Sequence, residues 1–172
     1  LNPVYTVLRQ MIDTVKAHKP DVSERDAYQL AKFSLGKVGL SEDVLKRYPH
    51  ELSGGMKQRV VISTALMLEP KILIADEPTT ALDVVVQAQI INLMKSLQRS
   101  LGMNIILITH DLSLVSELAD GVAVMYAGKF IEYGRLESIC RAPKHPYTYL
   151  LMKSITTLKR GVKLNYIPRA PP

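Results

Sequence analysis

The stretch Ile72-Leu73-Ile74-Ala75-Asp76-Glu77 decides the fold. Four consecutive apolar residues end in two adjacent carboxylates, which is typical of a parallel strand that is buried on both faces. A second run of the same kind, Ile105-Ile106-Leu107-Ile108, leads into His110. Between the two runs, residues 86–101 carry an apolar stripe at helical spacing, and Gly102 ends it. The alternation of strand, helix and strand predicts an α/β domain with a mainly parallel sheet.

The segments on either side of these strands complete the predicted organisation. Before the first strand, apolar spacing and capping residues predict helices at residues 6–18, 23–38, 42–47 and 56–68. After the second strand we expect a helix at 112–118 and a hairpin of two strands at 122–126 and 129–133. We therefore expect three parts: a helical part (1–55), a core (56–134) and a C-terminal extension (135–172).

The composition describes a folded protein without disulfides. The chain has 172 residues, of which 47% are apolar and 22% are charged, so one domain with a hydrophobic core is expected. Cys140 is the single cysteine, which excludes an intrachain disulfide and makes a cysteine-built metal site unexpected. No secretory leader is visible, and no apolar run approaches the roughly 20 residues that cross a bilayer. If a membrane is involved, we expect another subunit to cross it.

The net charge of +6 is concentrated near the C-terminus. Residues 138–172 hold seven Lys and Arg and no Asp or Glu, whereas residues 1–137 carry 15 basic against 16 acidic residues. A basic tail is compatible with nucleic acid, with an anionic membrane surface, or with simple solvation. The basic residues are spread rather than clustered, and no basic platform interleaved with aromatic residues is recognisable. Solvation is therefore the expected state of the tail.

The stretch Leu52-Ser53-Gly54-Gly55-Met56-Lys57-Gln58-Arg59 begins a predicted helix. The first amides of a helix lack partners inside it, and glycines let an anion approach the backbone closely. The stretch is thus a candidate seat for a phosphate, with Ser53, Gly54, Gly55 and Gln58 as candidate contacts. Alternatively, Ser53 is only the N-cap and the glycines only form a turn.

Glu77 and His110 are the candidate catalytic residues, and Asp76 is the candidate metal ligand. Open α/β sheets bind ligands at the carboxyl ends of their strands, where all three residues are predicted to lie. Asp76 could hold Mg²⁺ through water, and Glu77 could accept a proton from an attacking water. His110 could bond a terminal phosphate, and Asp83 adds a carboxylate in the turn before the long helix. The alternative is that the two acids merely mark the turn into solvent.

In this order, the motifs resemble those of the nucleotide-binding subunits of ATP-binding cassette (ABC) transporters. Leu52–Arg59 resembles the signature sequence, Ile72–Glu77 the Walker B strand, Ala81–Asp83 the D-loop, and His110 the switch histidine. The resemblance in order and spacing extends from Leu1 to about Tyr133. It implies the C-terminal portion of a P-loop NTPase (RecA-like) core, joined to an α-helical subdomain and a C-terminal extension.

A narrower resemblance, to oligopeptide and dipeptide importers, rests on the ends of the chain. Residues 1–6 resemble the segment after the Q-loop, and Pro78–Asp83 with Gln87–Ile90 is typical of this branch, although Val85 stands where Ser is commoner. Residues 142–148 resemble the His-Pro-Tyr extension of peptide and nickel importers. Residues 167–172 resemble its Pro-rich continuation, with Arg169 where Gly is usual. The cysteine-rich segment that often follows is not present, so no iron–sulfur site is inferred.

One expected motif does not occur in the sequence. No Gly-x-x-x-x-Gly-Lys-Ser/Thr loop, the main cradle for nucleotide phosphates, is found in the 172 residues, and no Q-loop is found either. The family places both upstream of Leu1, so we interpret the chain as a fragment. Alone, it is expected to bind little ATP and to hydrolyse none. Removal of the phosphate-loop strand should also expose the apolar strands and favour self-association.

For the parent protein, the resemblance implies ATP and Mg²⁺ as cofactors and a second ABC ATPase subunit as partner. Ser53, Gly54, Gly55 and Gln58 would contact ATP held by that partner, while Asp76, Glu77 and His110 act on the subunit's own ATP. Transmembrane permease subunits and, indirectly, a substrate-binding protein are further implied partners, at the cytoplasmic face of the membrane. The implied function is uptake of oligopeptides or dipeptides. A non-transport ABC ATPase associated with nucleic acid or ribosomes and a non-catalytic binding module remain open alternatives.

Overall fold

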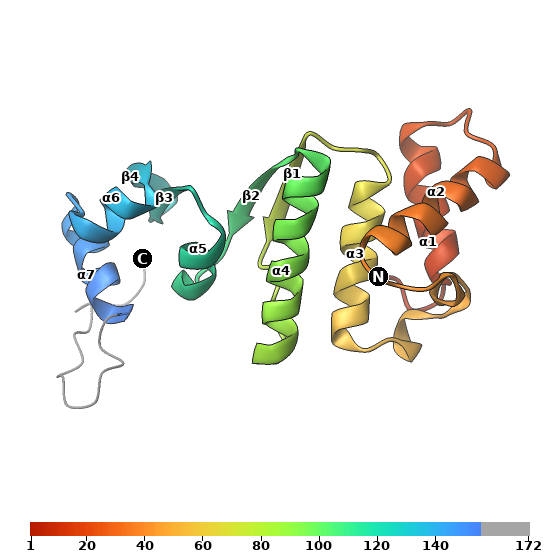
Figure 1. Cartoon of the computed structure of the whole chain (residues 1–172), viewed down its shortest axis with the longest axis horizontal. Coiled ribbons are helices and arrows are strands. Elements are labelled where there is room, and N and C mark those ends of the chain that lie inside the picture. Colours follow the sequence, from red (N-terminus) through yellow and green to blue (C-terminus); the bar gives the residue numbers. More distant parts are fainter. Residues whose placement is uncertain (156–172) are drawn as a thin grey trace. The chain divides into compact units, whose positions relative to one another are not determined.

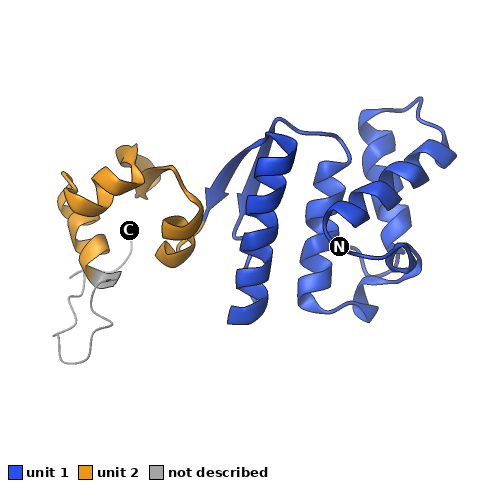
Figure 2. Ribbon diagram, in the orientation of Figure 1, with its two compact units in different colours: residues 1–108 blue, residues 109–172 orange. Residues whose placement is uncertain are grey.

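The structure, a computed structural model, describes residues 1–155. The chain divides into two compact units, residues 1–108 and residues 109–172 (Figure 2). The Pro-rich stretch at 167–172 and most of the basic tail lie outside the described residues. The finer division into parts 1–55, 56–134 and 135–172 stays a prediction.

The elements follow the predicted order (Figure 1). The first unit contains α1 (Val7–His18), α2 (Glu24–Lys37), the 3₁₀ helices η1 (Glu42–Lys46) and η2 (Pro49–Glu51), α3 (Gly54–Leu66), β1 (Ile72–Asp76), α4 (Val84–Leu101) and β2 (Asn104–Ile108). The second contains α5 (Leu112–Leu118), β3 (Gly121–Tyr126), β4 (Lys129–Arg135), α6 (Leu136–Arg141) and α7 (Pro146–Ile155). Mixed helix and strand with a parallel strand pair confirms the predicted fold class.

Capped helices form the beginning of the first unit. The side chains of Thr6 and Ser23 accept hydrogen bonds from the backbone N–H groups three residues later, and Gly39, with φ +72°, closes α2. The helices α1, α2 and α3 contact one another, and a buried hydrogen bond from Ser34 Oγ to the Ser63 carbonyl (2.6 Å) joins α2 to α3. Their core consists of Val7, Met11, Val15, Ala27, Ala31, Leu35, Val60 and Leu66.

The strands β1 and β2 pair in parallel, with Asp76 opposite Ile108 at their carboxyl ends. The prediction that both faces of these strands are buried is wrong. Exposure alternates along each strand: Leu73 is buried, whereas Ile74 is 64% exposed and its cross-strand partner Ile106 is 50% exposed. Ile72 and Ile108 are also exposed, on the same face of the strand pair as Ile74 and Ile106. One face of the pair is therefore covered, and the other is an apolar surface in contact with solvent.

This apolar surface is expected to drive self-association of the 172-residue chain. Exposed apolar strands with an unpaired edge tend to pair with further copies. Replacing Ile74 and Ile106 by Thr keeps β-branched side chains but removes much of the apolar area, so the double variant should sediment predominantly as a monomer where the parent chain associates. Analytical ultracentrifugation measures this difference. Val84→Thr, at an 80% exposed position on α4, is the matched control and should leave association unchanged; a monomeric parent chain would contradict the prediction.

The second unit is built on an antiparallel hairpin. β3 and β4 pair through the turn Ala127-Gly128, where both residues have positive φ, as in the tight turns that favour right-handed strand twist. The register shifts by an irregularity between Val124 and Met125. α6 packs on both strands, and Ile139 is buried there. The predicted hairpin is confirmed. Within residues 1–155 no helix is both long enough and apolar enough to span a bilayer.

Candidate functional site

The loop that follows β1 carries two of the predicted site residues and has an unusual backbone. Asp76 is the last residue of the strand and is exposed, and Glu77 follows it with φ +46°, in the left-handed region. Ala81 is also left-handed, with φ +63°. Non-glycine residues adopt this conformation rarely, at roughly 1–2 kcal/mol each, so the surrounding contacts must stabilise it.

Hydrogen bonds hold Glu77 in this strained position. Its backbone N–H donates to the Ile108 carbonyl of β2 (2.9 Å), which extends the parallel pairing by one bond. Its Oε2 accepts from the Thr80 hydroxyl (2.9 Å), and its carbonyl accepts from the Thr80 amide (3.2 Å). The carboxylate is therefore fixed at the carboxyl end of the sheet, where ligands of α/β folds bind. Thr80 is a positioning residue that the sequence analysis did not single out.

Asp83 and Gln87 fix the other end of the loop. Asp83 is the N-cap of α4, where its Oδ1 accepts from the Val86 amide (2.9 Å). One turn later, the Gln87 side-chain amide donates to the carbonyls of Thr79 (3.3 Å) and Leu82 (3.2 Å). The loop from Glu77 to Asp83 is thus held from the strand at one end and from the helix at the other.

The glycine turn at the start of α3 packs directly against this loop. Ser53 is the N-cap of α3, and its hydroxyl accepts from the Met56 amide (3.3 Å). A Cβ atom on Gly54 would lie 3.0 Å from Leu82 Cδ2, and one on Gly55 would lie 2.7 Å from Val86 Cγ1. The structure therefore brings Ser53, Gly54 and Gly55 next to the segment that contains Asp83. The glycines are required here by packing, whatever ligand they also meet.

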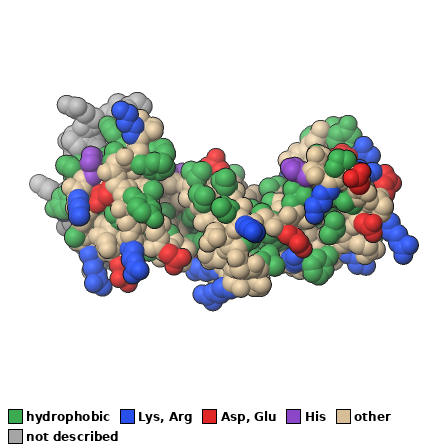
Figure 3. Space-filling model, turned by 90° about the horizontal axis from the view of Figure 1, so that it is seen from above, with side chains coloured by type: hydrophobic (Ala, Val, Ile, Leu, Met, Phe, Trp, Pro, Cys, Tyr) green, Lys and Arg blue, Asp and Glu red, His purple; other side chains and the backbone are tan. Residues whose placement is uncertain are grey.

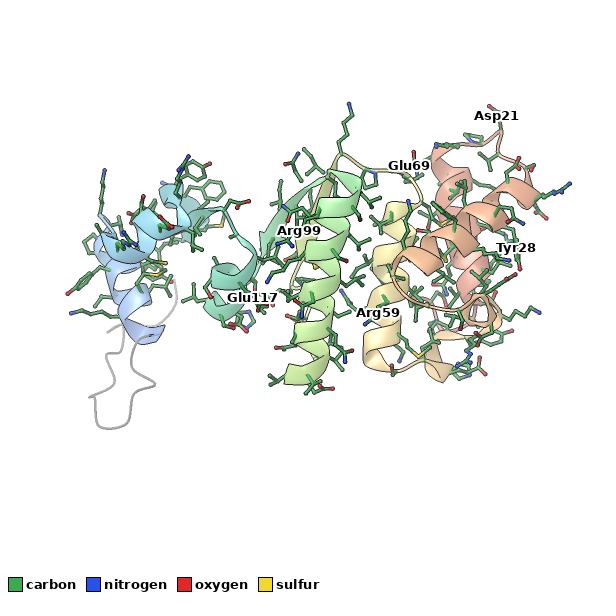
Figure 4. The ribbon with its side chains drawn as sticks, in the orientation of Figure 1. Asp21, Tyr28, Arg59, Glu69, Arg99 and Glu117 are labelled. Atoms are coloured by element: carbon green, nitrogen blue, oxygen red, sulfur yellow. The ribbon has the colours of Figure 1, made fainter. Side chains whose placement is uncertain are left out.

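Arg59 has a structural contact one turn further along α3. Arg59 is labelled in Figure 4. Its Nη1 donates to the carbonyl of Val38, the C-cap residue of α2, at 2.7 Å. The bond satisfies a carbonyl that has no partner within its own helix, and it ties the signature-like segment to the helices before it. Gln58, the preceding residue, is half-buried on the same helix.

His110 belongs to the second unit, whereas Asp76 and Glu77 belong to the first. The histidine is exposed and lies two residues after Ile108, the strand partner of Asp76. The next residue, Asp111, caps α5 by accepting from the Ser113 amide (2.9 Å) and the Ser113 hydroxyl (2.6 Å). The hydroxyl bond, with smaller contributions that include the charge on His110, lowers the pKa of Asp111. That His110 faces the same ligand as Asp76 and Glu77 stays a prediction.

The donor set fits a metal that binds through few protein ligands. Among residues 1–155, no group of three or more His, Cys, Asp or Glu side chains could enclose a metal ion. Asp76 supplies one exposed carboxylate, which suits Mg²⁺, because this ion keeps waters and takes much of its coordination from substrate phosphates. A dedicated zinc or calcium cage is not formed by the described side chains.

Two family models match the chain. A model described as ABC transporter matches residues 1–80, and a model described as Oligopeptide/dipeptide transporter, C-terminal region, matches residues 131–172. The first match contains the glycine turn and the strand that ends at Asp76. The second contains β4 from residue 131 onward, α6, α7 and the His-Pro-Tyr segment.

Curated relatives match over nearly the whole chain. The glutathione import ATP-binding protein GsiA of Escherichia coli strain K12 is 48% identical over 173 residues, which cover 99% of this chain and 28% of the relative. The protein of the same name from Shigella flexneri is 47% identical over the same share of each chain. The chain thus spans little more than a quarter of the length of these relatives.

Solved structures agree with the sequence matches. The dimeric bacterial ABC transporter cassette MJ0796 is similar with a TM-score of 0.66 and 28% identity, over 79% of this chain and 59% of that chain. A post-hydrolysis state of MJ0796 bound to ADP and Pi gives a TM-score of 0.65. An inward-facing metal-chelate type ABC transporter gives 0.72 at 28% identity, over 81% and 56% of the two chains. The chain belongs to the ABC transporter ATP-binding family and carries the C-terminal region of its oligopeptide/dipeptide branch.

Proposed function

We propose that the chain is a C-terminal part of an ATP-hydrolysing subunit that powers an importer for oligopeptides, dipeptides or similarly small peptides. The observation that carries this proposal is the loop from Glu77 to Asp83, which is held at both ends by hydrogen bonds and which, with the first turn of α4, packs against Gly54 and Gly55. A single local structure thereby links the strand-end carboxylates to the glycine turn. The similarity to proteins named for glutathione import supports a peptide cargo.

The proposed roles follow from the chemistry of each side chain. Asp76 would hold Mg²⁺ through water, and Glu77, fixed by Thr80, would accept the proton of the attacking water. His110 would bond the terminal phosphate and help to orient that water. ATP and Mg²⁺ are the cofactors of the proposed reaction, in which preorganised groups stabilise the charge on the transferred phosphate.

The glycine turn is proposed to act on a second nucleotide. Ser53 and Gly54 are exposed at the first turn of α3, where the leading amides have no partner within the helix. Together with Gly55 and Gln58 they would contact ATP held by a second ABC ATPase subunit, and Asp83 would lie near the same junction. The positive end of the helix favours the phosphate charge. The dimeric state of a similar cassette supports this arrangement.

The other proposed partners are transmembrane permease subunits, with a substrate-binding protein acting indirectly. The subunit would sit as a peripheral protein at the cytoplasmic face of the membrane. Nucleic acid is not a proposed partner, because basic and acidic side chains intermingle within each unit on the face seen in Figure 3.

The test uses the complete reading frame that contains Leu1–Pro172. We expect it to encode a Gly-x-x-x-x-Gly-Lys-Ser/Thr loop upstream of Leu1 and its product to hydrolyse ATP. Glu77→Gln should lower kcat by roughly 10²- to 10⁴-fold per site, because the general base is lost while the shape of the side chain is kept. Glu69→Gln, at an exposed turn before β1, is the matched control and should hydrolyse ATP normally. ATP turnover and nucleotide binding are measured on both variants.

Each alternative gives a different result. A reading frame without a phosphate loop, together with no ATP binding, would support the non-catalytic binding module. Turnover that is stimulated by RNA or DNA in a salt-dependent manner would support a non-transport ATPase. The 172-residue chain alone is expected to show no turnover above its own Glu77→Gln variant, and clear turnover would refute this expectation.

A further inference from the structure

The His-Pro-Tyr segment of the second unit has a contact partner that the sequence does not suggest. His145, Pro146 and Tyr147 lie at the start of α7, where the leading backbone amides have no partner inside the helix. The amides of Lys144 and His145 both donate to the carboxylate of Glu132 on β4, at 2.8 Å to Oε1 and 3.0 Å to Oε2. One carboxylate therefore receives two adjacent backbone donors, one on each oxygen.

The same segment is held by its own side chains as well. The Tyr147 amide donates a hydrogen bond to His145 Nδ1 (3.1 Å). The imidazole therefore caps the N-terminus of α7. The ring of Tyr147 contacts the ring of Tyr126 at the end of β3, with 4.7 Å between centroids. The three residues of the motif thus supply a helix cap, a helix-starting proline and an aromatic contact to the hairpin.

A negative charge is well placed at this position for a physical reason. Glu132 lies at the positive end of the α7 dipole and accepts charge-assisted hydrogen bonds from the backbone. The hydroxyl of Thr148, on the first turn of α7, is fully buried beside this carboxylate. The Lys144 amide first, then the Thr148 hydroxyl and the His145 amide, lower the pKa of Glu132.

We propose that Glu132 is the positioning residue of the His-Pro-Tyr extension: its carboxylate binds the first amides before α7 and latches that helix to the β3–β4 hairpin. The latch joins residues 12 and 13 positions apart in sequence. It fixes where the chain leaves the hairpin and enters the extension. Loss of the carboxylate releases the segment 142–147 from β4 while the hairpin, which has its own backbone pairing, stays formed.

The experiment follows the backbone amides of Lys144 and His145 by nuclear magnetic resonance in the 172-residue chain. In Glu132→Ala, both amides should lose roughly tenfold or more of their protection from hydrogen exchange, because both acceptors are removed. Glu132→Gln keeps one carbonyl acceptor and should lose less. Glu137→Gln, an exposed acid in the first turn of α6, is the matched control and should leave both amides protected.

A titration of the unmodified chain tests the latch without any substitution. A carboxylate whose pKa is lowered in the folded state stabilises that state above its ordinary pKa, and the contribution is lost as pH falls through the lowered value. The two amide shifts should therefore move together, with a midpoint below the ordinary pKa of a glutamate, and this transition should be missing in Glu132→Gln. Amides that neither titrate nor respond to Glu132→Ala would overturn the proposal, and so would protection lost equally in Glu137→Gln.

Discussion

Gly55→Ala is expected to lower the free energy of unfolding of the first unit by about 1–2 kcal/mol, although alanine is the better helix former. The new Cβ would lie 2.7 Å from Val86 Cγ1, closer than real contacts allow. Val86 is β-branched and half-buried on α4, so it cannot rotate away freely. Overpacking of this kind costs about 1–3 kcal/mol, and the gain of up to about 1 kcal/mol in helix propensity offsets only part of it. Urea denaturation measures the change.

Two further variants separate the contact from the general effect of a glycine. Gly36→Ala lies in α2 with no atom within 4 Å of the new Cβ, so it should stabilise the chain by about 0.5–1 kcal/mol. Combining Gly55→Ala with Val86→Ala removes the obstructing methyl groups, and the double variant should be more stable than the two separate losses predict. If Gly55→Ala and Gly36→Ala had equal free energies of unfolding, the contact with Val86 would not contribute to stability.

Arg59→Ala is expected to destabilise the first unit by about 2 kcal/mol. The substitution removes a charged hydrogen bond to the Val38 carbonyl and leaves that acceptor at the end of α2 without its partner. It also removes a half-buried aliphatic stem, whose packing is lost with the charge. Thermal or urea unfolding, followed by circular dichroism of the helices, measures the loss.

The matched control for this arginine is Arg25→Ala, an exposed position on α2, which should change stability by no more than about 0.5 kcal/mol. Arg59→Lys keeps the charge but has one compact ammonium in place of the planar guanidinium, and it should recover only part of the loss. Wild-type stability in Arg59→Ala would mean that water replaces the guanidinium without cost.

The sequence predicted what depends on local pattern. Helix starts at Thr6 and Ser23, the strand ending at Asp76 and the turn at Ala127-Gly128 follow from side-chain chemistry within a few residues, and the structure confirms them. The exposed side of β1 could not be predicted in this way. A run such as Ile72–Ala75 indicates apolar surroundings, but it does not say how many faces the 172 residues themselves can cover.

The positioning residues were missed because their partners lie far along the chain or in the backbone. Arg59 bonds a carbonyl 21 residues away, and Glu132 bonds amides 12 and 13 residues away, neither of which has a side-chain signature. The glycines at 54 and 55 were read as an opening for phosphate, whereas the structure adds Leu82 and Val86 as neighbours that leave no room for a methyl group. Only Thr80 lies close in sequence to its partner: it follows Glu77 by three residues, a spacing at which a hydroxyl can reach the carboxylate.

The two hydrogen bonds from Gln87 to the loop limit the insertion and deletion of residues in that loop. Its single amide group reaches the carbonyls of both Thr79 and Leu82, whose separation is fixed by the number of residues between them. Adding or removing one residue there would move one carbonyl out of reach and would change the left-handed turn at Ala81. We therefore expect sequences that keep a glutamine four residues after the capping aspartate to keep this loop at constant length, while the turn between α1 and α2 tolerates length variation.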